Sequence, residues 1–476
     1  MPSLSRELAK WIVNLRYEDL PPEVVDRAKG VTLHCISSVL LGAQTKDGRQ
    51  AVKLITDEET GVAHGATILV DGRKVTRGGA AFATSEMAFA GGKWDTYKML
   101  THPGTSIIPC ALVGAETAQS SGRDFIVAVA AAYEVAARLG ADFIATVVSR
   151  GFHPGPVFGI FGAGIAAAKL GGLDEEQMNA VIALCASLAG TSVEGPRSGG
   201  KALREGAAVR NAMLAVALAR AGHAGGETVL EGAAGFYHAY AGNNEGLLTY
   251  SFEGKTHADL GAITRDLGSS WQFLETLYRI YSISGYNIAH IEVTAALCAE
   301  HDIRPENVER VEAVVNWLET QYPSPAFPVR REDGPPRIGM TPYYTAYAVV
   351  KRSFPVLQSW GGGPPDVSDA PPEIVEMTRR VTIIPSHTMT LFGPRITIFT
   401  KDGKSYTRQG TGREFIWDFE EEARRIRDIV PGIPIPAAQY EALIASCRDL
   451  DREARAAKLI ELTLAENKGA IQNTGT

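Results

Sequence analysis

Several predicted helices in the first half of this chain are apolar nearly all the way round, and this feature narrows the possible folds most. In DFIVAVAAAYEVAARLG (124–140) and AAVRNAMLAVALARAG (207–222), alanine and other apolar residues fill most positions. A helix without a polar face must be covered by other helices. The many small side chains also allow helix axes to approach closely. The sequence therefore predicts a bundle of buried helices.

Residues that favour helix ends set the limits of three of these helices. One opens at Pro21–Pro22 and stops at Gly42, one is capped by Ser120 or Ser121 and ends at Gly140, and one starts with the capping-box pair Asp174 and Gln177 and closes at Gly190. Within this helical part, Asp71–Gly72 lies between residues of high β-propensity. Such a pair predicts a small β-hairpin.

The character of the sequence changes after Leu267. Three stretches rich in β-branched residues follow, at 307–318, 379–386 and 394–409, the last with a second Asp-Gly turn at Asp402–Gly403. Residues 323–344 and 361–373 contain many prolines and glycines, which are typical of long loops. From about Glu414 the helical pattern returns.

This order of segments predicts a mainly α fold with an inserted α+β lid. The helical domain takes its first part from residues 1–267. The lid is expected in residues 268–413, and residues 414–476 return to the helical domain.

Composition limits the partners of the chain. It has 47 Lys and Arg against 54 Asp and Glu, a net charge of −7, and no basic stripe, so nucleic acid is not expected to bind. No apolar run approaches the ~18–20 residues that a membrane span needs. Charged residues interrupt the N-terminal segment, which therefore does not read as a secretory signal. The five cysteines are far apart, which indicates neither a disulfide framework nor a zinc ribbon. We expect a cytoplasmic protein.

Two histidines have matching surroundings. His102 lies in LTHPGTS and His153 in GFHPGPV, and each His-Pro step precedes an apolar helical stretch. Proline favours an extended residue before it and suits the first helical turn, which places both imidazoles at helix N-termini. The positive end of the helix dipole there attracts anions. Proton transfer on a carboxylate substrate and a purely structural N-cap are both compatible with this pattern.

Other candidates are polar residues close to these helices. Lys201 follows a Ser-Gly-Gly turn and precedes a buried helix, so it is a candidate to hold a carboxylate, with Arg204 nearby. Asp95 lies just upstream of His102 as a possible orienting carboxylate. All three side chains are also compatible with a purely structural or solvent-exposed role. No tight set of three metal-ligating residues is present, so we expect no metal site.

The ordered set THP, GFHP, K-x-x-x-x-G-x-A and the closing Asp-Gly hairpin resembles the MmgE/PrpD family, which includes 2-methylcitrate dehydratase, cis-aconitate decarboxylase and iminodisuccinate epimerase. The similarity covers nearly the whole chain. It implies a two-domain architecture with a cleft at the junction, a homodimer, and no metal or organic cofactor. It also implies catalytic roles for His102, His153, Lys201 and the lid residue Tyr322. Asp95 falls on the last carboxylate of the family's D-F-D-D segment.

The chain departs from that pattern at three places. The family's first aspartate in the D-F-D-D segment falls on Gly92, and its preceding histidine falls on Phe89. The lid lysine of the family aligns within the stretch RIYSISGYNIAH. Its counterpart there is Tyr281, or Arg279 if two residues are inserted. The pocket is therefore expected to carry fewer charged groups than the family's tricarboxylate sites.

The resemblance favours a lyase of the dehydratase type that acts on a small carboxylic acid by proton transfer next to a carboxylate. The substrate-binding residues would then be Asp95, Arg204 and Arg279 or Tyr281. Isomerase or epimerase activity is an alternative, since Gly92 removes one carboxylate, and decarboxylation is another. A homologue that binds a ligand without catalysis is a further alternative.

Overall fold

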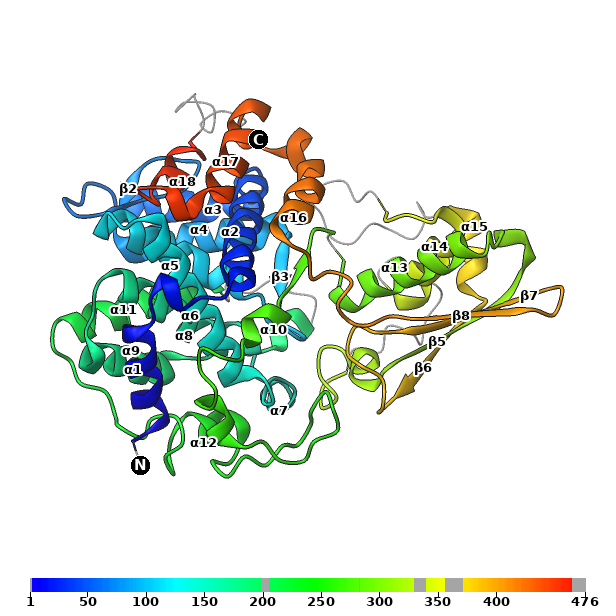
Figure 1. Cartoon of the computed structure of the whole chain (residues 1–476), viewed down its shortest axis with the longest axis horizontal. Coiled ribbons are helices and arrows are strands. Elements are labelled where there is room, and N and C mark those ends of the chain that lie inside the picture. Colours follow the sequence, from blue (N-terminus) through cyan, green and yellow to red (C-terminus); the bar gives the residue numbers. More distant parts are fainter. Residues whose placement is uncertain (1, 198–204, 282, 329–339, 356–370, 465–476) are drawn as a thin grey trace.

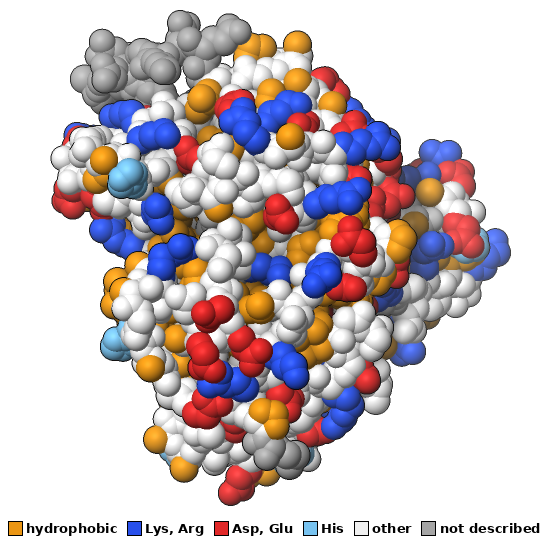
Figure 2. Space-filling model, turned by 60° about the vertical axis from the view of Figure 1, so that its left-hand side comes forward, with side chains coloured by type: hydrophobic (Ala, Val, Ile, Leu, Met, Phe, Trp, Pro, Cys, Tyr) orange, Lys and Arg blue, Asp and Glu red, His pale blue; other side chains and the backbone are white. Residues whose placement is uncertain are grey.

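The computed structural model describes residues 2–197, 205–281, 283–328, 340–355 and 371–464. It is mainly α-helical, as predicted. Figure 1 shows a large helical lobe, made of α1–α12 and α16–α18, beside a smaller sheet lobe that contains α13–α15 and strands β5–β8. No described helix combines the length and the apolar composition that crossing a membrane requires. On the face that Figure 2 shows, basic and acidic side chains are interspersed.

The centre of the helical lobe is a set of small-residue helices in close contact. α8 (Pro154–Leu170) contacts α5 (Pro103–Ala118), α6 (Gly122–Gly140) and α11 (Glu205–Arg220). A β-carbon added to Gly162 of α8 would lie 2.6 Å from Ile107 Cδ1 of α5. Alanine there would require Ile107 to move, and nearly all of α8 is buried, so the expectation of closely spaced, buried helices is confirmed.

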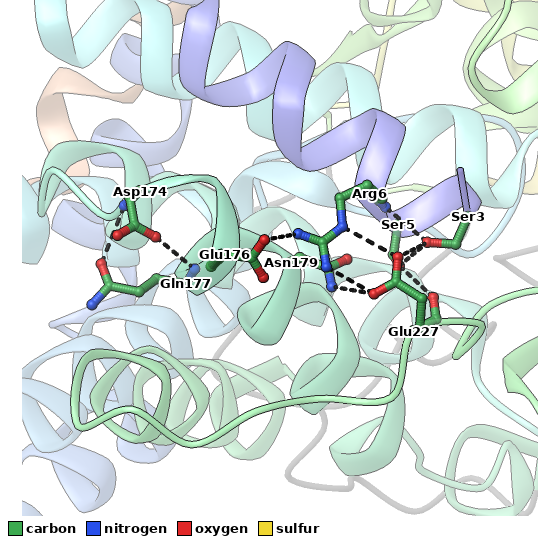
Figure 3. Close-up of polar contacts among 8 residues, drawn as sticks. All are labelled: Ser3, Ser5, Arg6, Asp174, Glu176, Gln177, Asn179 and Glu227. Carbon is green, nitrogen blue, oxygen red and sulfur yellow. Dashed lines mark hydrogen bonds and ion pairs between the residues drawn. The ribbon is translucent and has the colours of Figure 1, made fainter. Parts of the chain in front are cut away.

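The predicted helix starts are confirmed. α2 spans Pro22–Gly42, and Ser121 caps α6 by accepting from Asp124 N–H. Asp174 and Gln177 form the capping box of α9 (Glu175–Leu188), as Figure 3 shows. α9 ends before Gly190, because Ala189 is already extended.

A cluster of polar residues fastens the first helix to the rest of the lobe (Figure 3). From α1 (Leu4–Asn14), the Arg6 guanidinium bonds Glu227 with Nη2 to Oε2 at 2.8 Å and also reaches Glu176 on α9. Ser3 Oγ, at the N-cap of α1, donates to Glu227 Oε1 at 2.9 Å. These groups are partly exposed, so they position the helix more than they stabilise it.

Two short sheets lie in or beside the helical lobe. β1 (Ala66–Thr67) and β2 (Lys74–Val75) pair antiparallel around Gly72, which confirms the first hairpin. β3 (Trp94–Thr96) pairs with β4 (Leu277–Arg279), so a strand from the predicted lid lies against the helical lobe. The remaining helices of this lobe are α3 (Lys46–Glu58), α4 (Arg77–Gly91), α7 (Ile144–Ser149), α10 (Glu194–Arg197) and α12 (Phe236–Ala241).

The C-terminal helices return to the helical lobe. α16 (Phe419–Ile426) and α17 (Ala437–Arg448) contact α2, and α18 (Lys458–Glu461) contacts α17. His34 Nδ1 of α2 lies 2.6 Å from Glu422 Oε1 of α16, with both side chains buried. This pair joins the first and last parts of the chain, which explains why the helical lobe needs both.

The sheet lobe contains one four-stranded sheet in the order β6-β5-β7-β8. β5 (Val308–Asn316) runs parallel to β6 (Val381–Ser386) and antiparallel to β7 (Arg395–Thr400). β7 continues through the predicted turn at Gly403 into β8 (Ser405–Gln409). The lobe's helices are α13 (Gly285–Glu300), α14 (Thr341–Lys351) and α15 (Pro372–Thr378).

The expectation of a loop over 323–344 is wrong at its end. α14 begins at Thr341, because Pro342 occupies the first helical turn, where its missing N–H costs no hydrogen bond. Residues 329–339 of this stretch, and most of the second predicted loop at 361–373, lie outside the described residues.

A buried carboxyl in the sheet lobe gives a stability prediction. Glu319 is 6% exposed, its Oε1 accepts from Phe392 N–H at 2.8 Å, and its Oε2 has no hydrogen-bond partner among the described residues. Burial raises the pKa of Glu319 to about 8. An unfolded glutamate titrates near 4.3, so between about pH 4.3 and 8 the folded state keeps a proton that the unfolded state has lost. This contribution to stability is complete below about pH 4.3 and is lost as the pH rises to 8.

We therefore expect Glu319→Gln to flatten the decline of unfolding free energy with rising pH by about 1.4 kcal/mol per pH unit between pH 5 and 8. Urea unfolding at several pH values measures this slope. Equal slopes in the wild type and the variant would show that Glu319 is ionised in the folded protein.

Candidate active site

His102 is the N-cap of α5 and is buried against β3. Its Nδ1 lies 3.0 Å from the main-chain oxygen of Asp95, and its ring centroid lies 4.5 Å from that of Trp94. A carbonyl can only accept, so we assign the proton of neutral His102 to Nδ1. The lone pair is then on Nε2, which makes His102 a proton acceptor.

Asp95 organises the start of α5. Both of its carboxylate oxygens accept from Gly104 N–H, at 2.9 and 3.1 Å, and Tyr133 donates its hydroxyl to Oδ2 at 2.5 Å. A β-carbon on Gly104 would lie 2.9 Å from Asp95 Oδ1, so glycine leaves room for the carboxylate. Asp95 therefore supports His102 through the backbone, with its carboxylate held by α5 and α6.

His153 is the N-cap of α8 and is 1% exposed. Its Nδ1 accepts from Gly155 N–H at 3.2 Å, so in the neutral ring the proton is on Nε2. The tautomer of His153 is thus opposite to that of His102. One imidazole is arranged to accept a proton at Nε2 and the other to donate one from Nε2.

The starts of the two histidine helices meet at one small cavity. Its volume is about 10 Å³, and its lining includes His102 and Pro103 of α5, Ala137 of α6, and Gly155 of α8. A space of this size holds about one water molecule. The structure therefore brings together the two predicted histidine segments, which are separated by 50 residues of sequence.

The ring of Trp94 connects His102 with a buried cation from the sheet-lobe side. Arg279 pairs with Trp94 across β3 and β4, and its Cζ lies 4.2 Å from the centroid of the Trp94 ring. The Arg279 side chain is buried, and its Nε has no hydrogen-bond partner among the described residues. Burial lowers the pKa of Arg279 to about 10. A buried guanidinium with an unused N–H is suited to bind a carboxylate.

Tyrosines from the sheet lobe face this guanidinium. Tyr286, Tyr322 and Tyr344 all contribute electrostatically to the pKa of Arg279, and the Tyr322 ring lies 6.1 Å from that of Tyr286. Tyr281 is placed differently, because its ring stacks on Phe354 at 3.8 Å. Of the two residues considered for the lid cation, Arg279 is therefore the one beside Trp94 and Tyr322.

Lys93 is a cation that the sequence reasoning missed. It directly precedes β3, and burial together with the neighbouring Arg279 guanidinium lowers its pKa to about 8. The local signal was a lysine directly after Gly91 and Gly92. Its proximity to Arg279 depends on the pairing of β3 with β4, which no local sequence pattern predicts.

Glu205 was missed as well. It opens α11 and is 2% exposed. Its Oε1 lies 3.0 Å from the position of a β-carbon on Gly155, and the Nδ1 and Cε1 of His153 lie 3.1 Å from that position. The carboxylate and the imidazole therefore border the same gap, which the absent side chain of Gly155 leaves open.

Two predicted site residues, Lys201 and Arg204, lie outside the described residues. Within the described ranges, no group of three His, Cys, Asp or Glu side chains is arranged to hold a metal ion. All five cysteines are buried and free of disulfides.

The chain is similar to one protein family and to fungal proteins named as cis-aconitate decarboxylases or as like them. The model of the MmgE/PrpD N-terminal domain matches residues 6–246. A cis-aconitate decarboxylase-like protein of Aspergillus oryzae is 28% identical over 307 residues, which are 62% of this chain and 61% of that protein. A cis-aconitate decarboxylase of Aspergillus terreus is 25% identical over 293 residues, 59% of this chain and 57% of that protein. The aligned region thus spans about 60% of the length of these curated relatives.

Proposed function

This chain belongs to the MmgE/PrpD family, and from that membership we propose that it is a lyase that acts on a small carboxylic acid by proton transfer next to a carboxylate. The observation that carries the proposal is the pair of buried histidines with opposite tautomers at the starts of α5 and α8, two helices that meet at one small cavity. Arg279, on the same tryptophan ring as His102, supplies the positive charge for the substrate.

In the proposed mechanism, the substrate carboxylate binds Arg279, with Tyr322 as a hydrogen-bond donor from the sheet lobe. Nε2 of His102 takes the proton from the carbon next to the carboxylate. The resulting enolate-like charge is stabilised by the guanidinium in a site with little water. Nε2 of His153 donates a proton to the leaving group or to the product carbon.

Two bond cleavages fit these roles. In dehydration, His102 removes the α-proton, a C=C bond forms, and the hydroxyl leaves as water with the proton of His153. In decarboxylation, a C–C bond breaks, CO₂ leaves, and the carbanion takes a proton from His153. Of these two cleavages, dehydration is the first candidate, since it uses both histidines, whereas decarboxylation needs only the proton of His153. The names of the relatives favour decarboxylation as the second. Isomerisation or epimerisation would need only the two proton transfers.

NMR of a panel of di- and tricarboxylates in deuterated buffer tests the proposal. We expect incorporation of deuterium next to a carboxylate, together with loss of water or CO₂. Arg279→Met should raise the half-saturating concentration about 10- to 100-fold, the effect of losing one charge-assisted hydrogen bond of 1.5–3 kcal/mol. Saturable binding without exchange would favour a ligand-binding homologue. Neither binding nor exchange would refute the substrate class.

The remaining properties are parts of the same proposal. We propose a cytoplasmic homodimer that needs neither metal nor organic cofactor. Activity should then persist after dialysis against a chelator, and light scattering should give twice the mass of the chain. Activity that returns only on addition of a metal ion would contradict the proposed mechanism.

A further inference from the structure

We propose that Glu205 acts on His153 through its charge and stabilises the imidazole when the ring is protonated. This inference rests on the proposed function in assigning proton transfer to His153, but its physical basis is local. The two residues come from different helices, α11 and α8, and both are buried.

The geometry limits how far apart the two groups can be. Glu205 Oε1 is 3.0 Å, and His153 Nδ1 is 3.1 Å, from one point, the position of a β-carbon on Gly155. Their separation is therefore at most about 6 Å. At such a distance inside a protein, a carboxylate favours the charged form of its neighbour. Any larger residue at position 155 would enter the space between them.

The main chain next to Glu205 is anchored to α4. Gly206 N–H, in the first turn of α11, donates to Glu86 Oε1 of α4 at 3.0 Å. The start of α11 is therefore anchored next to His153, with Glu205 directed towards the N-terminus of α8. His102 and Tyr97 line the same cavity as Gly155 and are the other titratable rings there.

The arrangement also parallels that at the other histidine. In both His-Pro-Gly segments, the glycine leaves room for a buried carboxylate, Asp95 at Gly104 and Glu205 at Gly155. Asp95 accepts N–H bonds from the start of its helix and supports His102 through the backbone. Glu205 would act on its imidazole more directly, because the His153 ring itself borders the gap. Since Gly92 stands where the family has an aspartate, Glu205 would return a carboxylate to the site from another helix.

The test is an NMR titration of the free protein with selectively labelled histidines, with the His153 signals assigned from their loss in His153→Asn. We expect Glu205→Gln to lower the measured pKa of His153 by about one unit or more, the usual scale for removing a nearby opposite charge. Glu205→Asp, which keeps the charge but draws it back from the ring, should lower the pKa of His153 by a smaller, still measurable amount. Glu319→Gln, at a buried glutamate in the sheet lobe that stays protonated below about pH 8, controls for the substitution itself and should leave the His153 titration unchanged.

An unchanged His153 pKa in folded Glu205→Gln would overturn the proposal. If that variant does not fold, Glu205→Asp decides, because the retreat of its carboxylate should still lower the pKa measurably. Enzyme assays separate this proposal from the previous one. A shifted His153 pKa in a protein that turns over no carboxylate would refute only the proposed function. Turnover with an unshifted His153 would refute only the role of Glu205.

Discussion

Replacing His153 with asparagine should lower turnover about 10²- to 10⁴-fold, the usual contribution of general acid-base catalysis. The asparagine Oδ1 can accept from Gly155 N–H as His153 Nδ1 does, so the cap of α8 should survive. Asparagine has no proton to exchange near neutral pH. We therefore expect only a small change in unfolding free energy together with a large loss of turnover.

Two further variants separate the chemistry from the cap. His153→Ala should show the same loss of turnover plus a destabilisation of about 1 kcal/mol from the missing cap. His223→Asn, at an exposed position, should change neither quantity. Deuterium exchange and urea unfolding measured on the same preparations would decide. Near wild-type exchange in folded His153→Asn would mean that another group donates the proton.

Arg138→Met should destabilise the protein by about 3–5 kcal/mol, because it leaves a buried carboxylate without its cation. Arg138 pairs with Glu134 one turn earlier on α6, and their side chains are 5% and 0% exposed. The guanidinium also donates to the main-chain oxygens of Arg265 and Ser270, at 2.6 and 2.7 Å. Glu134 Oε2 accepts from Phe273 N–H at 2.9 Å. This one pair therefore holds the segment that leads to β4 and Arg279.

Urea unfolding measures the loss, and Arg265→Met is the matched control. Arg265 belongs to the same segment, but its ion pair with Asp259 is exposed on both sides, so its loss should change the stability little. If both substitutions had equally small effects, the Arg138 pair would be dispensable. Since β4 carries Arg279, the Arg138 variant should also bind substrate less well at temperatures where it is still folded.

The local features of the fold followed from the sequence. The capping residues Ser121 and Asp174 set helix starts, because a side chain that satisfies free N–H groups does so wherever the helix lies. The two His-Pro steps placed His102 and His153 at helix N-termini for an equally local reason. The start of α14 was missed, because the surrounding prolines and glycines hid the helical signal at Thr341–Pro342.

Only part of the candidate site could be predicted from local sequence patterns. Whether Arg279 or Tyr281 occupies the lid-cation position was undecided from spacing, since an insertion of two residues changes the alignment. The pairing of β3 with β4 puts Arg279 on Trp94, whereas Tyr281 stacks on Phe354. The two strands are about 180 residues apart, and the sequence of neither strand predicts which strand it pairs with.

The sequence by itself thus determined the buried helices, their ends and the two histidines, since backbone capping and apolar periodicity act over a few residues. Only the tertiary structure decided that Lys93 lies beside Arg279 and that Glu205 borders the ring of His153. Both contacts arise where separate helices and strands come together. Electrostatic interaction depends on the distance between the groups in space, and local sequence patterns do not predict that distance.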